Sequence, residues 1–168
     1  QIVSDGHGGA MITWQDARND SDDVYAQRVN GEGVTLWAAN GVAVSTAASS
    51  QWLVQLVPDG HGGAIITWQD SRNGSPDIYA QRVNKNGVSL WARNGLAVCT
   101  ASGSQSFPQI TIDSRWLSGN QQMQSPEQSN TANEMKVLIV VWQDARSGTN
   151  DIYAQAINED AKEFKETL

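Results

Sequence analysis

Acidic and basic side chains recur at a fixed spacing along this chain. Asp16, Asp70 and Asp144 each follow a Trp-Gln pair, an Arg stands two positions after each of them, and a second Asp stands seven positions after. Carboxylates in a short loop accept hydrogen bonds from backbone N–H groups and pair with guanidinium groups. We therefore interpret the set as a structural loop clamp. Its members in the second and third occurrences are Asp70, Arg72 and Asp77, and Asp144, Arg146 and Asp151.

The first occurrence of this set allows a second interpretation. Its loop carries four carboxylates, those of Asp16, Asp20, Asp22 and Asp23. Carboxylate and carbonyl oxygens are the ligands that Ca²⁺ prefers, although the spacing of these four differs from that of an EF-hand loop. A Ca²⁺-binding loop is therefore the alternative to the structural clamp, and the sequence indicates no other cofactor.

The tryptophans form two groups. Trp14, Trp68 and Trp142 lie within apolar runs, which places them in the expected core. The other four stand near turn-forming or polar segments: Trp37, Trp91, Trp52 and Trp116. An exposed indole beside Asn, Gln and Asp side chains offers an apolar face and hydrogen-bond partners to a sugar ring. These four residues are therefore candidates for ligand binding, with core packing as the alternative.

No familiar catalytic arrangement is present in the sequence. His7 and His61 lie in Gly-rich turns, and Cys99 is the only cysteine, so neither a disulfide within the chain nor a Cys-based metal site is expected. The sequence contains no nucleophile elbow and no zinc-protease motif, and nothing marks a pair of carboxylates placed for glycoside hydrolysis. We therefore expect that the protein is not an enzyme.

The charge of the chain excludes some partners. Its 168 residues carry a net charge of -7, which disfavours binding to nucleic acid or to an anionic membrane surface. No apolar run approaches the roughly 20 residues that span a bilayer. The expected partners are therefore other proteins, and a glycan in the alternative interpretation.

These residues stand on an internal repeat. Residues 5–45 and 59–99 differ at 11 of 41 positions, which leaves 30 identities at an offset of 54. A third copy is recognisable around Trp142, and the repeat divides the chain into units 1–54, 55–108 and 109–158. The third copy contains about 20 extra residues, predicted as a polar surface loop over 114–136. A charged tail follows over 159–168.

Each unit has the pattern of four short strands joined by turns. In the second unit we predict strands over 52–57, 64–69, 77–84 and 88–98. Apolar residues occupy both faces of the second strand, whereas a sandwich strand alternates more cleanly and a solenoid has parallel strands. The predicted fold is an all-β, β-propeller-like array of three four-stranded antiparallel blades, the third incomplete because its fourth strand is missing.

The repeat also resembles a known type. Gly-Gly-Ala, two aliphatic residues and Trp-x-Asp-x-Arg, then Asp-Ile-Tyr-Ala-Gln-Arg-Val and Leu-Trp, are similar to a β-propeller-type tandem repeat of secreted and surface bacterial proteins. The resemblance implies an exported, extracellular or cell-surface module without catalytic activity. Because three blades cannot close a ring, we expect a homo-oligomer or a subunit of a larger assembly. A lectin-like carbohydrate-binding propeller, assisted by Ca²⁺, is the alternative.

Overall fold

The computed structural model describes residues 1–116, 134–158 and 160–161, without the side chains of residues 114–116 and 134–135. Eleven strands and no helix occur within these ranges, so the all-β prediction is confirmed. Accordingly, the described part of the chain holds no helix that is long and apolar enough to cross a membrane.

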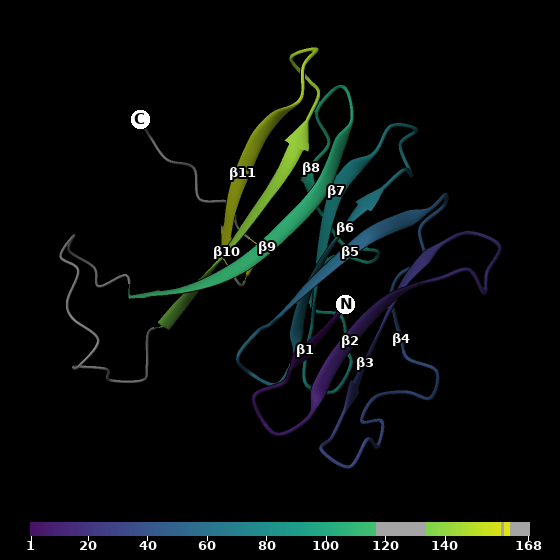
Figure 1. Cartoon of the computed structure of the whole chain (residues 1–168), viewed down its shortest axis with the longest axis vertical. Helices are drawn as coiled ribbons and strands as arrows, with labels where there is room; N and C mark the ends of the chain where they lie inside the picture. The colour runs from purple at the N-terminus through teal and green to yellow at the C-terminus, as the bar shows by residue number, and fades with distance from the viewer. Residues whose placement is uncertain (117–133, 159, 162–168) are drawn as a thin grey trace.

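The strands form three antiparallel sheets that correspond to the three repeats, although the first strands of the second and third sheets begin before the predicted unit boundaries at 54/55 and 108/109 (Figure 1). The first sheet has the order β1-β2-β3-β4 and contains β1 (Ile2–Ser4), β2 (Ala10–Asp16), β3 (Asp23–Val29) and β4 (Val42–Ser45). The second sheet has the order β5-β6-β7-β8 and contains β5 (Gln51–Pro58), β6 (Ala64–Asp70), β7 (Asp77–Val83) and β8 (Leu96–Cys99). The third sheet has three strands in the order β11-β10-β9 and contains β9 (Gln105–Trp116), β10 (Glu134–Asp144) and β11 (Asp151–Asn158).

The fourth strand of the second sheet is shorter than the predicted strand over 88–98. The chain between β7 and β8 forms turns with one isolated bridge, and only Leu96–Cys99 pairs with β7. Side chains supplement the few backbone hydrogen bonds of this segment, such as the one that the Leu90 N–H donates to the Arg82 carbonyl. The Asn84 side-chain oxygen accepts the backbone N–H of Val88, and the Gln81 side-chain oxygen accepts that of Trp91. These side chains therefore satisfy the backbone N–H groups of Val88 and Trp91 without a ladder partner.

The prediction of a loop over 114–136 is wrong at both of its ends. Strands β9 and β10 remain paired as far as Trp116 and Glu134, so both ends of the predicted loop belong to a long hairpin. The reason is that the antiparallel ladder continues through Ser114 and Lys136. The rest of that prediction, 117–133, lies outside the described residues. So does the charged tail, apart from Asp160 and Ala161.

The three sheets pack on one another in chain order. Each sheet has a front face, which points toward the next sheet along the chain, and a back face, which points toward the preceding one. One apolar cluster joins the front face of the first sheet to the back face of the second, and another joins the second to the third. All seven residues of β6 are buried, because both of its faces lie inside a cluster. Among the described residues the sheets do not close into a ring, so the stack has an uncovered face at each end.

Candidate functional site

The carboxylate of Asp70, at the end of β6, is the centre of a compact polar cluster. Asp70 is fully buried. One of its oxygens accepts the backbone N–H and the Nε of Arg72, both at 2.9 Å. The other accepts Arg72 Nη2 at 2.5 Å and the indole Nε1 of Trp68 at 2.8 Å. The carboxylate is therefore enclosed by donors from its own unit.

The guanidinium of Arg72 extends this cluster across the second sheet. It lies over the ring of Tyr79 in β7, 3.8 Å from the centroid, and that ring stacks on Trp68. Its Nη2 also donates to the carbonyl of Asn94 at 2.7 Å. The cluster thus ties the β6–β7 loop to β7 and to the turn before β8. Its chemistry is that of a structural clamp.

The same cluster occurs in the first and third sheets. Arg18 pairs with Asp16 and covers Tyr25, and Arg146 pairs with Asp144. The Arg146 guanidinium, followed by the indole N–H in the same sheet, holds the pKa of Asp144 well below its usual range, although burial opposes this shift. A carboxylate bound by its own Arg in every unit is typical of a structural ion pair.

The second Asp of each loop has different partners. Asp77 is buried and accepts the side-chain amide of Asn73 at 2.7 Å. Burial raises the pKa of Asp77, and the amide of Asn73 opposes the shift. In the third loop the hydroxyl of Ser147 donates to Asp151 at 2.6 Å. Asp77 and Asp151 therefore close their loops through neutral donors.

The four carboxylates considered for Ca²⁺ do not converge. Asp16 is held by Arg18, and Asp23 is buried with the Asn19 amide on it at 2.8 Å. Asp20 is exposed at a positive φ of 73°. Within the described ranges, no three His, Cys, Asp or Glu side chains are grouped so that they could hold a metal ion.

A second carboxylate cluster was not predicted from the sequence. Asp5, in the Gly-rich turn after β1, accepts the backbone N–H groups of His7 and Gly9 at 2.8 and 2.9 Å. Arg28 in β3 donates to it at 2.9 and 2.7 Å. The His7 N–H, followed by Arg28, lowers the pKa of Asp5 to about 2. Asp59 and Arg82 repeat the pair, so a recurring Asp and Arg 23 positions apart was the signal that could have revealed it.

The four candidate tryptophans occupy different surroundings. Trp37 is buried in the first apolar cluster, and its Nε1 donates to the carbonyl of Lys85 at 3.0 Å. Trp91 is half-buried and packs against the second cluster. Trp52 is half-buried in β5, and Trp116 ends β9 with a side chain outside the described part. The structure therefore does not gather them into one aromatic platform.

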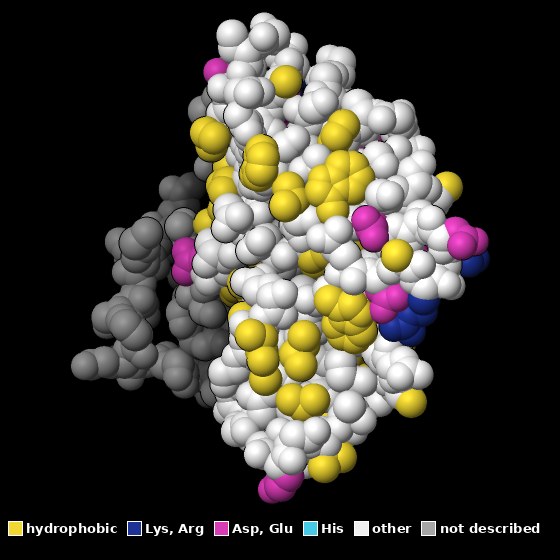
Figure 2. Space-filling view, turned by 45° about the vertical axis from the view of Figure 1, so that its right-hand side comes forward, with side chains coloured by type: hydrophobic (Ala, Val, Ile, Leu, Met, Phe, Trp, Pro, Cys, Tyr) yellow, Lys and Arg dark blue, Asp and Glu magenta, His cyan; other side chains and the backbone are white. Residues whose placement is uncertain are grey.

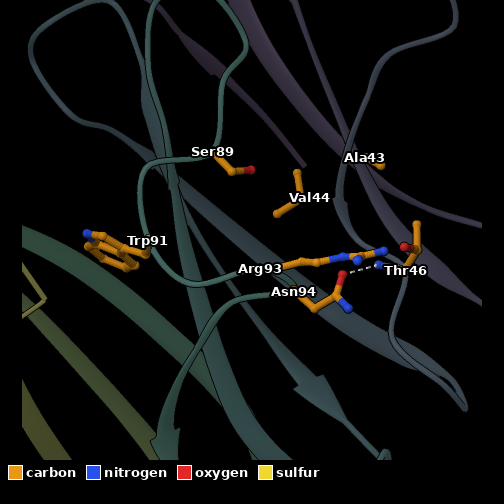
Figure 3. Close-up of a pocket in the computed structure, with 7 residues that line it drawn as sticks. All are labelled: Ala43, Val44, Thr46, Ser89, Trp91, Arg93 and Asn94. Carbon is orange, nitrogen blue, oxygen red and sulfur yellow. Dashed lines mark hydrogen bonds between the residues drawn. The ribbon is translucent and has the colours of Figure 1, made fainter.

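One of these tryptophans does line a pocket. A hollow of about 370 Å³ lies between β4 of the first sheet and the turn before β8 of the second (Figure 3). Its lining residues are Ala43, Val44, Thr46, Ser89, Trp91, Arg93 and Asn94. The side-chain oxygen of Asn94 accepts the backbone N–H of Thr46 at 3.1 Å, which joins the two sheets. Figure 3 shows Arg93 extended toward Thr46, while Trp91 lies apart on the other side. An indole, a guanidinium and polar groups suit a small polar ligand.

Comparison with protein-family models, with curated proteins and with solved structures finds no match for this chain.

Proposed function

We propose that this chain is a non-catalytic interaction module of an exported protein or larger assembly, built as an open β-propeller-like array. The observation that carries the proposal is that one kind of inter-sheet interface occurs twice. In both places the front face of one antiparallel sheet meets the back face of the next through equivalent residues. Consecutive antiparallel sheets that are buried on both faces are the building principle of propeller blades.

The residues of the two interfaces support this arrangement. Val24 on the front face of the first sheet and Ile78 on that of the second are equivalent, and both are fully buried. Trp68 and Trp142 are equivalent on the back faces, and each is buried in its own cluster. A repeated interface that uses the same positions makes each sheet a unit that any number of neighbours can extend.

The clamps support a role without catalysis. Each loop carboxylate beside a Trp-Gln pair is bound by an Arg two positions later, and this holds in all three sheets. Asp5 and Asp59 are bound in the same way by an Arg from β3 or β7. A side chain that performs a reaction is needed once, whereas a side chain that holds a loop is needed in every unit. The resemblance of the repeat to secreted and surface bacterial repeats supports export.

The pocket beside Trp91 favours a second candidate, a lectin-like carbohydrate-binding propeller. A sugar needs an apolar face and several hydrogen-bond partners. Trp91 supplies the first, and Arg93 and Asn94 supply the second, at the junction of two sheets. This candidate differs from the interaction module in two expected results. The chain binds a glycan, and a substitution in the pocket abolishes that binding.

Two assays on the whole chain test these candidates. For the interaction module we expect no turnover of a panel of chromogenic glycosides, esters and phosphates, and no retention on a glycan array. Retention that Arg93→Ala abolishes would favour the lectin-like candidate, and loss of that retention with a chelator would add Ca²⁺ to it. Val88→Ala, an exposed position in the same turn region, is the matched control. Turnover of any substrate would refute the non-catalytic proposal.

A further inference from the structure

One apolar position is buried in two sheets and exposed in the third. Val24, Ile78 and Ile152 are equivalent residues at the starts of β3, β7 and β11. Val24 and Ile78 are 0% exposed, whereas Ile152 is 78% exposed. The second sheet covers Val24, and the third covers Ile78. The front face around Ile152 thus has the composition of an interface and, within the described chain, no sheet on it.

The back face of the first sheet shows the converse. Ile2 in β1 is equivalent to Leu56 in β5, but Ile2 is 65% exposed and Leu56 only 1%. On the same face Ile12 is half-buried, whereas its equivalent Ile66 is fully buried. This face therefore has the residues that the other two sheets bury against a preceding sheet. Figure 2 shows hydrophobic side chains spread over one side of the molecule, with few charged side chains among them.

The open front face of the third sheet is hollowed where a strand would lie. A hollow of about 370 Å³ is lined there by Phe107, Gln109, Val141, Gln143 and Ile152, and also by Trp142, which is buried in the cluster on the back face. On the second sheet, the residue equivalent to Gln143 is Gln69, and its side-chain oxygen accepts the backbone N–H of Phe107 in β9 at 3.4 Å. The first strand of the following sheet thus occupies this place between the second and third sheets. The first strand of the first sheet is β1, whose three residues Ile2–Ser4 are equivalent to residues 56–58 of β5.

We propose that a second copy of this chain covers both open faces. The back face of its first sheet, with Ile2 and Ile12, lies on the front face around Ile152, and the reverse contact is made on the other side. This inference rests on the proposed function, because it continues the propeller-like stacking into a second chain. The two open faces are the two halves of an interface that the chain already forms twice.

Closure of the ring determines the number of copies. A contact between a front face and a back face is heterologous, so it forms an endless chain unless the rotation closes. Two copies supply six sheets, which lies within the four to eight blades of propellers, whereas three copies supply nine. The structure therefore points to a closed dimer.

Light scattering coupled to size-exclusion chromatography tests the dimer. The unaltered chain is expected at twice its own mass when it is measured at roughly 0.1 mM. Ile152→Asp and Ile2→Asp each place a charge on one open face. Both positions are exposed in the single chain, so we expect neither substitution to lower its unfolding free energy substantially. Each is expected to weaken the dimer about 100-fold, because a buried Ile contributes at least tenfold and the dimer contains two such sites. Val88→Asp is the matched control, since Val88 and its equivalent Val34 are both exposed outside the inner interfaces.

A mixture of the two variants distinguishes this geometry from other dimers. Ile152→Asp keeps an intact back face, and Ile2→Asp keeps an intact front face. The mixture leaves one of the two contacts intact and places both Asp residues on the other, whereas each variant alone has both contacts impaired. Because one contact can lose no more than its whole contribution, the mixed dimer is expected to be tighter than the dimer of either variant. A dimer that pairs like faces would show no such rescue.

A monomeric mass for the unaltered chain at every concentration would overturn the pairing. A dimer that survives both face variants, or that Val88→Asp disrupts to the same extent, would also overturn it. Failure of the pairing is distinguishable from failure of the proposed function. A monomer that turns over no substrate refutes the pairing alone, whereas turnover refutes the non-catalytic module whatever the mass.

Discussion

Replacing Asp70 by Ala is expected to destabilise the fold strongly. The change removes a fully buried carboxylate and leaves the indole N–H of Trp68 and the guanidinium of Arg72 without their acceptor. Loss of one partner from a buried ion pair costs about 3–5 kcal/mol. The Arg72 side chain remains 18% exposed and keeps its bond to Asn94, so it recovers part of its solvation. We expect a loss near the lower end, about 3 kcal/mol of unfolding free energy.

The assay is urea unfolding at neutral pH, followed by far-UV circular dichroism and analysed as two-state. All variants are made in the Ile152→Asp background, so that self-association does not contribute. Asp16→Ala is the matched control, because the same clamp in the first sheet holds an Arg18 side chain that is 37% exposed. We expect a clearly smaller loss there, since exposed ion pairs contribute little. Asp70→Asn, which keeps an acceptor oxygen, is expected to lie between, and it supplies the measurement if Asp70→Ala fails to fold.

Two results would refute this reasoning. An Asp70→Ala variant with an unchanged urea midpoint would show that the clamp does not stabilise the sheet. Equal losses for Asp70→Ala and Asp16→Ala would show that burial of the carboxylate does not set the magnitude.

Four further substitutions have expected outcomes that the same unfolding assay measures. Gly95→Ala is expected to cost about 3 kcal/mol or more, because Gly95 has a φ of +96° and a Cβ there would lie 2.5 Å from a ring carbon of Trp68. Gly74→Ala, with a φ of +98° and open space around it, is expected to cost only about 1 kcal/mol, and similar losses for the two would contradict the steric reason. The pKa of Asp5 is lowered from 3.8 to about 2, so its stabilising contribution is present above pH 3.8 and is lost as the pH falls toward 2. Asp5→Asn is therefore expected to reduce the change of unfolding free energy with pH between pH 3.8 and 2. A variant whose unfolding free energy changes with pH as steeply as that of the unaltered chain would contradict this role of Asp5. Because burial raises the pKa of Asp77, its charged form opposes folding once the pH exceeds 3.8, so Asp77→Asn is expected to lose no stability at neutral pH, and a marked loss there would contradict this.

Local features of the fold were predictable from the sequence. The 54-residue repeat and the pattern of short strands joined by turns predicted all-β units, and the structure has three antiparallel sheets. The loop clamp was predictable for the same reason, because Asp70 and Arg72 are two positions apart on one turn. Interactions of this range depend on backbone geometry that a few neighbouring residues determine.

Features that depend on distant segments required the structure. The Asp5–Arg28 pair joins residues 23 positions apart, and the extent of the β9–β10 hairpin depends on ladder pairing across its loop. The convergence that a Ca²⁺ site needs was likewise a question of position in space, and the described carboxylates do not provide it. Spacing along the chain alone does not determine such distances.

Ile78 and Ile152 show most clearly what the sequence leaves open, because they are the same residue at the same position of the repeat. Ile78 and Ile152 follow the same Asp and precede the same Tyr-Ala-Gln, so the sequence alone assigns them the same place in a strand. Ile78 is nevertheless fully buried and Ile152 is exposed. The sequence determines that each strand has two apolar faces, because the side chains of a strand alternate between them. Only the tertiary structure determines which of those faces has a neighbour, because burial depends on the sheet that packs opposite and not on the strand itself.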